Sequence, residues 1–231
     1  MPAFQHAIDL GYCYLETDVH ATSDGVLVAF HDDSLDRVTN MTGQIRDLPW
    51  SQVRQAQIDG SETIPLMADL LSSFPAARIN IDVKAKHSVE PLAKLIADTG
   101  SVDRVCVGSF SDSRLKGIRD LVGPRLCTSL GPLGITALRA ASFGVPSPSF
   151  TGNGSFLSAA CAQVPIAMKG VSITDQRFID AAHRRGLQVH VWTIDSPEQM
   201  NELLDQGVDG IMTDEPKVLK DVLTTRQSWV E

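Results

Sequence analysis

The sequence predicts a (β/α)₈ barrel, and three observations lead to this fold class. Stretches of alternating hydrophobicity follow one another along the chain, separated by amphipathic stretches of helical period, as in repeated βα units. Polar side chains stand at the ends of several predicted strands, and a barrel brings such ends together at one mouth. None of the 17 glycines forms the fingerprint that a dinucleotide-binding sheet needs after its first strand, which disfavours an open doubly wound sheet.

The composition is typical of a single globular domain that covers residues 1–231. Hydrophobic residues make up 43% and charged residues 21%, which excludes disordered and fibrous classes. The four cysteines contain no Cys-x-x-Cys pair, which argues against zinc sites and disulfide frameworks. A net charge of −8 without a basic run argues against nucleic acid as a partner. No apolar run approaches the roughly 20 residues of a membrane helix, so we expect a soluble, cytoplasmic protein.

The clearest predicted strand covers residues 79–84. Its apolar side chains occupy one face, and Asn80, Asp82 and Lys84 occupy the other. One face of this strand is therefore suited to packing against helices and the other to chemistry. Further strands are predicted at residues 12–19, 26–30, 104–110, 125–130, 163–168, 187–194 and 209–213.

Helices with chemical start and stop signals separate the later strands. A capping box begins a helix at Ser196, and Gly207 ends it. Two further helices are predicted over residues 175–185 and 111–122, and we expect Leu121 on the buried face of the latter. Strands and helices therefore alternate along the chain with short connections, as in repeated βα units.

Three carboxylates are predicted to gather at the barrel mouth. Glu16 and Asp18 stand two residues apart near the end of a strand, so they share a face, and Asp82 has a similar place in its own strand. Like charges in a confined site repel, and a hard divalent cation would compensate for them. Ligand sets of oxygen alone select Mg²⁺ or Ca²⁺. The alternative is that each carboxylate is solvated or forms a salt bridge.

Three other side chains are candidates for the same mouth. His31 directly follows the apolar strand 26–30 and could transfer protons near neutral pH, or it could be a hydrogen-bonded structural residue. Lys84 shares a face with Asp82 and either binds a substrate phosphate oxygen or neutralises that carboxylate. Trp192 lies near the end of its strand, where it could line a pocket.

Several short motifs along the chain are considered together, because each alone would be weak. They are Glu16-Thr17-Asp18-Val19, Thr22 to Gly25, His31-Asp32, Leu35-Asp36-Arg37, Thr39 to Gly43, Asn80 to Lys84, Trp192-Thr193 and Gly207 to Asp214. In this order they resemble the glycerophosphodiester phosphodiesterase family over nearly the whole chain. The resemblance implies a phosphodiesterase-type barrel that hydrolyses glycerophosphodiesters to sn-glycerol 3-phosphate and an alcohol with one Mg²⁺ or Ca²⁺.

The resemblance also implies roles for individual residues. Glu16, Asp18 and Asp82 match the metal-ligand strand ends of the family. His31 matches the second of its two catalytic histidines, and Lys84 matches its phosphate-side lysine. Asp82 stands where the family commonly has Glu, so the carboxylate is retained but reaches one methylene less far.

A second departure from the family concerns its first strand. The family opens with a strand that ends in His-Arg, followed by Glu-Asn-Thr, whereas this sequence begins at the next helix, within residues 2–11. We therefore expect a barrel that lacks its first strand, with no counterpart for the first catalytic histidine, a phosphate-binding arginine and one acid that helps hold the metal.

Three functions remain open from the sequence. The first is a phosphodiesterase, and the second is a catalytically impaired barrel with a binding or regulatory role. A related barrel phospholipase is the third, and an exposed apolar rim would distinguish it. The Gly-, Pro- and Ser-rich stretch at residues 142–160 is predicted to be a loop inside the domain, and it does not decide between them.

Overall fold

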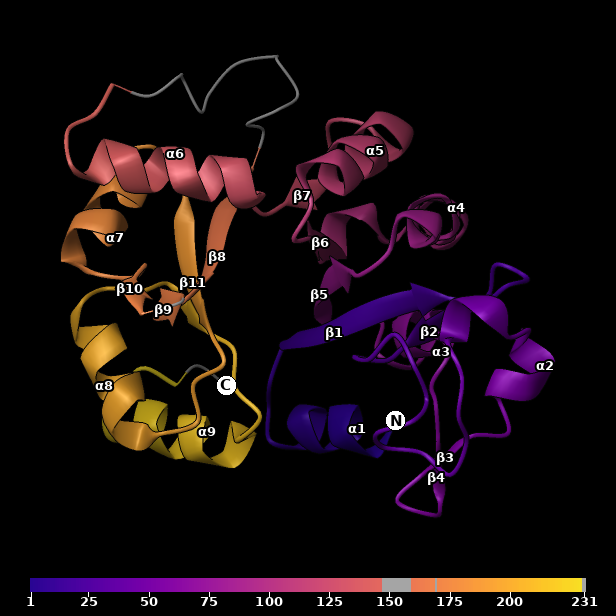
Figure 1. Ribbon diagram of the computed structural model, residues 1–231. Coiled ribbons are helices and arrows are strands. Elements are labelled where there is room, and N and C mark those ends of the chain that lie inside the picture. Colours follow the sequence, from indigo (N-terminus) through magenta and orange to yellow (C-terminus); the bar gives the residue numbers. More distant parts are fainter. Residues whose placement is uncertain (147–158, 169, 230–231) are drawn as a thin grey trace. The chain divides into compact units, whose positions relative to one another are not determined.

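The structure, a computed structural model, describes residues 1–146, 159–168 and 170–229 (Figure 1). Most of the loop predicted over residues 142–160 lies outside this part. The chain divides into two compact units, which are residues 1–6 with 12–127, and residues 7–11 with 128–231. Both units combine helices with a sheet, and each is considered by itself.

A five-stranded sheet forms the centre of the first unit, in the order β2-β1-β5-β6-β7. Its strands are β1 (Tyr14–Ala21), β2 (Leu27–Ala29), β5 (Arg78–Val83), β6 (Val105–Gly108) and β7 (Cys127–Thr128, divided between the units). β5 pairs in parallel with both β1 and β6, so the carboxyl ends of these three strands meet at one edge. The register places Asp18 directly opposite Asp82.

The alternation predicted for residues 79–84 is confirmed in β5. Ile79, Ile81 and Val83 are at most 1% exposed, whereas Asp82 and Lys84 on the other face are partly exposed. Helices α4 (Val89–Thr99) and α5 (Asp112–Val122) lie against each other in this unit (Figure 1).

The helix predicted over residues 111–122 is confirmed as α5, with Ser111 as its N-cap. The expectation that Leu121 is buried was wrong, because this side chain is 56% exposed. Leu115 and Ile118 define the buried stripe, and Leu121 lies at the edge of that stripe in the last turn.

The predicted strand over residues 26–30 forms β2, which pairs with β1 as an antiparallel hairpin. The connection between them is a tight turn, in which Thr22 N donates to Val26 O and Gly25 has a φ of 80°. A parallel partner would need a crossover of about a dozen residues or more. The hairpin returns the chain along β1, so that Phe30 N donates to Asp18 O at 3.0 Å and His31 follows directly.

The segment after β2 forms a small core of its own. Its fully buried side chains include Leu35, Ile45 and Val53. The short elements of the first unit are α1 (Pro2–Asp9, divided between the units), α2 (Trp50–Val53), β3 (Gln57–Ile58), β4 (Glu62–Thr63), α3 (Met67–Ser73) and the 3₁₀ turns η1 (Ile45–Asp47), η2 (Lys86–Ser88) and η3 (Ser101–Arg104). This core gives the segment after β2 a defined place beside the sheet.

The second unit contains a three-stranded parallel sheet in the order β12-β11-β8. Its elements are α6 (Pro132–Ser142), β8 (Cys161–Pro165), β9 (Ala167–Met168), β10 (Val171–Ser172), α7 (Gln176–His183), β11 (Gln188–Trp192), α8 (Pro197–Asp205), β12 (Gly210–Ile211) and α9 (Pro216–Thr225). The predicted cap of α8 is confirmed, because Gln199 N donates to Ser196 Oγ at 3.4 Å. Among the helices of the described residues, none has the length and apolar character that a bilayer span requires.

Two leucines of the first unit provide a test of this core. Leu92 in α4 is 0% exposed, so we expect Leu92→Ala to lower the free energy of unfolding by about 2–5 kcal/mol. Leu121→Ala in α5 is the matched control and should change it by less than about 0.5 kcal/mol. Urea denaturation of the two variants measures both values, and equal losses would contradict the packing described.

Candidate active site

A hollow of about 420 Å³ lies at the carboxyl ends of the strands in the first unit. It is lined by His20, His31, Asp32, Asp33, Ser34 and Lys84. These side chains come from the end of β1, from the residue after β5 and from the segment after β2. Two imidazoles, two carboxylates, a hydroxyl and an ammonium group therefore share one hollow.

Lys84 links two carboxylates on neighbouring strands. Its Nζ lies 2.9 Å from Asp18 Oδ1 and 3.2 Å from Asp82 Oδ2. The three side chains are only 12–24% exposed, so water screens their charges less than at the surface. Like-charge repulsion between the two carboxylates is offset here by a lysine, which is one of the two roles that the sequence leaves open for Lys84.

Burial and charge shift the pKa values of this group in definite directions. Burial raises the pKa of the Asp18 carboxyl, and the contact with Lys84 opposes this effect only in part. For Lys84, burial lowers the pKa, but its contacts with Asp18 and Asp82 outweigh burial and leave it above the usual value. Lys84 is therefore charged throughout the neutral range.

One oxygen of Asp82 fits a further cation. Asp82 Oδ1 is buried and has no hydrogen-bond partner within the described residues. A buried carboxylate oxygen without a partner is costly, because it has lost its hydration. Oxygen donors from Asp18 and Asp82 suit Mg²⁺ or Ca²⁺. These two residues therefore fit the hard cation that the sequence predicts.

Glu16 is exposed and lies on the same face of β1, opposite Asn80. The register thus places the Glu16–Asn80 pair two positions before the Asp18–Asp82 pair. Within the described ranges, no group of three or more His, Cys, Asp or Glu side chains is arranged to hold a metal ion. The structure brings Asp18 and Asp82 together with Lys84, and the three-carboxylate ligand set stays a prediction.

His31 is oriented by a carboxylate that is itself held by an arginine. His31 Nδ1 lies 2.7 Å from Asp32 Oδ1. Arg37 donates to both oxygens of Asp32, from Nε at 2.6 Å and from Nη2 at 2.8 Å. The hydrogen bonds from Arg37 have the largest effect on the pKa of Asp32, and the one from His31 the next largest. Together they hold this pKa well below its usual range. An ionised carboxylate only accepts, so Nδ1 carries the proton and Nε2 is the nitrogen left for chemistry.

Two side chains at this site were not predicted from the sequence. His20 is 5% exposed and lines the hollow, but the predicted strand stopped at residue 19. The spacing of two from Glu16 through Asp18 to His20 is the pattern that could have identified it. Phe110 follows β6, is 55% exposed, and has its ring centre 5.9 Å from Lys84 Nζ.

Trp192 is the last residue of β11 and is half-buried in the second unit, where it pairs with Pro165. Its proposed contact with substrate remains a prediction, because β11 is described within its own unit.

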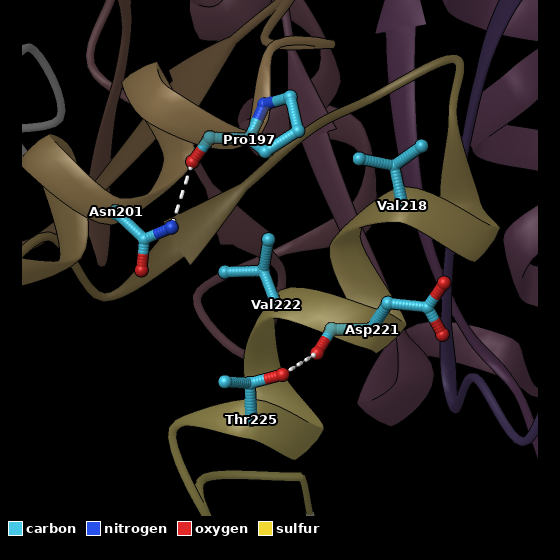
Figure 2. Close-up of a pocket in the computed structure, with 6 residues that line it drawn as sticks. All are labelled: Pro197, Asn201, Val218, Asp221, Val222 and Thr225. Carbon is cyan, nitrogen blue, oxygen red and sulfur yellow. Dashed lines mark hydrogen bonds between the residues drawn. The ribbon is translucent and has the colours of Figure 1, made fainter.

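A second hollow, of about 390 Å³, lies between α8 and α9 (Figure 2). It is lined by Pro197, Asn201, Val218, Asp221, Val222 and Thr225. Asn201 donates to Pro197 O, and Thr225 donates to Asp221 O. These polar groups are thus used within the helices, and the lining contains neither an imidazole nor a cation. The hollow of the first unit is the better candidate for catalysis.

The family model of the glycerophosphoryl diester phosphodiesterase family matches residues 1–218. The chain belongs to this family. It is 38% identical over 230 residues to the Mycobacterium tuberculosis protein named "Probable glycerophosphodiester phosphodiesterase 2", covering 99% of this chain and 86% of that protein. It is 26% identical to human lysophospholipase D GDPD1, covering 96% of this chain and 81% of the human protein.

Comparison with solved structures confirms the predicted barrel fold. A phosphodiesterase from Oleispira antarctica, solved in complex with the product sn-glycerol-3-phosphate, superposes with a TM-score of 0.77. The superposition covers 96% of this chain and 90% of that one, at 18% sequence identity. The family fold is thus present over nearly the whole chain.

Replacing Lys84 tests the electrostatic role described for it. Lys84→Met leaves two partly buried carboxylates facing each other, so we expect a loss of about 1–3 kcal/mol in the free energy of unfolding at pH 7. The loss should shrink as the pH falls, because protonation removes the repulsion. Lys94→Met, which removes an exposed ion pair with Asp98 in α4, is the control and should have no measurable effect. A Lys84→Met variant as stable as wild type at pH 7 would contradict this role.

Proposed function

We propose that this chain hydrolyses glycerophosphodiesters to sn-glycerol 3-phosphate and an alcohol. The observation that carries the proposal is one hollow lined both by Lys84, whose ammonium group bridges two carboxylates, and by the His31 imidazole, which a carboxylate orients. A cationic group is what a phosphodiester needs for binding, and an imidazole is suited to proton transfer. The family match and the names of the relatives support the same activity.

Lys84 and His31 have separate tasks in this mechanism. Lys84 is charged at neutral pH and stabilises negative charge that develops on the phosphate oxygens. His31 carries its proton on Nδ1, so Nε2 accepts a proton from the attacking water and returns it to the departing alkoxide. One imidazole serves both steps, and Asp32 stabilises the imidazolium in between.

Asp18 and Asp82 would hold a divalent cation, with Glu16 as a further ligand from the same face of β1. Such an ion supplies Lewis acidity toward a phosphate oxygen when it is bound. We propose Mg²⁺ or Ca²⁺ because all the ligand atoms would be carboxylate oxygens. We propose Trp192 as a substrate contact and the cytoplasm as the place of action.

A lysophospholipase D activity is the second candidate, because the human relative carries that name. Both reactions hydrolyse a phosphodiester, so one assay with two substrates separates them. Glycerophosphocholine is the short substrate and lysophosphatidylcholine is the lipid.

³¹P NMR with each substrate tests the function and the role of His31 together. We expect conversion of glycerophosphocholine to sn-glycerol 3-phosphate, and a 10²–10⁴-fold lower kcat in His31→Ala, since a general acid–base is lost. His183→Ala removes a similar exposed histidine, 2.8 Å from Asp209, and should leave kcat unchanged. Phosphocholine as the product, or a fully active His31→Ala variant, would refute the mechanism.

Calorimetric titration with Mg²⁺ and Ca²⁺ tests the cation site. Asp18→Asn and Asp82→Asn should each abolish tight binding, because each removes a charged oxygen from a small ligand set. Asp98→Asn, on the exposed face of α4, should bind as wild type does. Affinity should also fall at lower pH, because the raised pKa of Asp18 lets protons compete with the ion. Unchanged affinity in both site variants would exclude the assignment.

A further inference from the structure

His20 is a buried imidazole that the proposed mechanism does not use. It is 5% exposed, comes from the penultimate position of β1, and lies in the same hollow as His31 and Lys84. Its Nε2 lies 3.2 Å from the backbone oxygen of His31. A carbonyl oxygen can only accept, so Nε2 carries the hydrogen and donates it. His20 thus has a fixed contact with the residue that is proposed to transfer protons.

Hydrogen bonds to β1 hold the backbone at His31. The His31 side chain is 73% exposed, so its own burial does little to fix its place. Two hydrogen bonds tie this stretch to β1, one from Phe30 N to Asp18 O at 3.0 Å and one from His20 Nε2 to His31 O. The bonds lie on either side of the His31 α-carbon, so together they set the direction in which the imidazole leaves the chain.

We propose that His20 is a positioning residue for His31. By holding the His31 carbonyl, it keeps the His31 ring where Nδ1 meets Asp32 and Nε2 meets the substrate. This inference rests on the proposed function of His31. A displacement of about 1 Å at a reacting group can cost up to about 100-fold in rate, so the loss of one backbone contact is sufficient for a kinetic effect.

The decisive experiment compares His20→Gln with His20→Met. The two replacements have nearly the same length and volume, but only the glutamine amide can donate to His31 O. We expect His20→Met to lower kcat for glycerophosphocholine about 10–100-fold with KM little changed, and His20→Gln to retain most of the wild-type kcat. His87→Ala is the control, because His87 Nε2 contacts the carbonyl of Ala21, also in β1, at 3.0 Å but lies outside the hollow.

A second readout works without substrate. Long-range ¹H–¹⁵N spectra should show the Nδ1–H tautomer of His31 in wild type and in His20→Gln, and a mixture of tautomers in His20→Met. If wild type hydrolyses no glycerophosphodiester, the proposed function fails while these spectra still decide the role of His20. Equal kcat values in the Gln and Met variants, or one His31 tautomer in all three proteins, would overturn the positioning role.

Discussion

Two carboxylates face each other across β1 and β5, and the ammonium group of Lys84 lies between them. Asp18 and Asp82 occupy the same register position, so the pairing of the strands alone brings the two charges together. Lys84 offsets their repulsion from the residue directly after β5. At the same end of β1, His20 Nε2 contacts His31 O and Phe30 N donates to Asp18 O, so His31 is held beside this charged group.

Groups that do not line the hollow hold the backbone near Asp18, Asp82 and Lys84. Arg114 donates to Ser109 Oγ at 2.8 Å and to the carbonyl of Lys84, and Ser109 donates to the carbonyl of Val83 at 2.8 Å. At the end of β1, Ala21 N donates to Ser88 Oγ at 3.0 Å. Polar contacts with the main chain thus fix both strand ends without using the side chains that line the hollow.

Much of this site could be predicted from the alternation of polar and apolar residues along single strands. The rest depends on which strands pair and in what register, and this alternation does not give that information. Alternation in residues 79–84 placed Asp82 and Lys84 on the polar face correctly, because one face of a strand must pack. His20 was overlooked because β1 extends two residues past the predicted end, where hairpin pairing with β2 prolongs the strand. The salt bridge between Lys84 and Asp18 joins residues 66 positions apart, and only strand register brings them together.

Anomalous diffraction from crystals soaked with Ca²⁺ and sn-glycerol 3-phosphate would show whether the Asp18–Asp82 pair binds a cation and leaves Lys84 for phosphate. We expect a calcium peak about 2.3–2.6 Å from oxygens of both carboxylates and a phosphate oxygen within hydrogen-bond distance of Lys84 Nζ. A calcium peak elsewhere, with Lys84 still bridging both carboxylates and away from the phosphate, would contradict it.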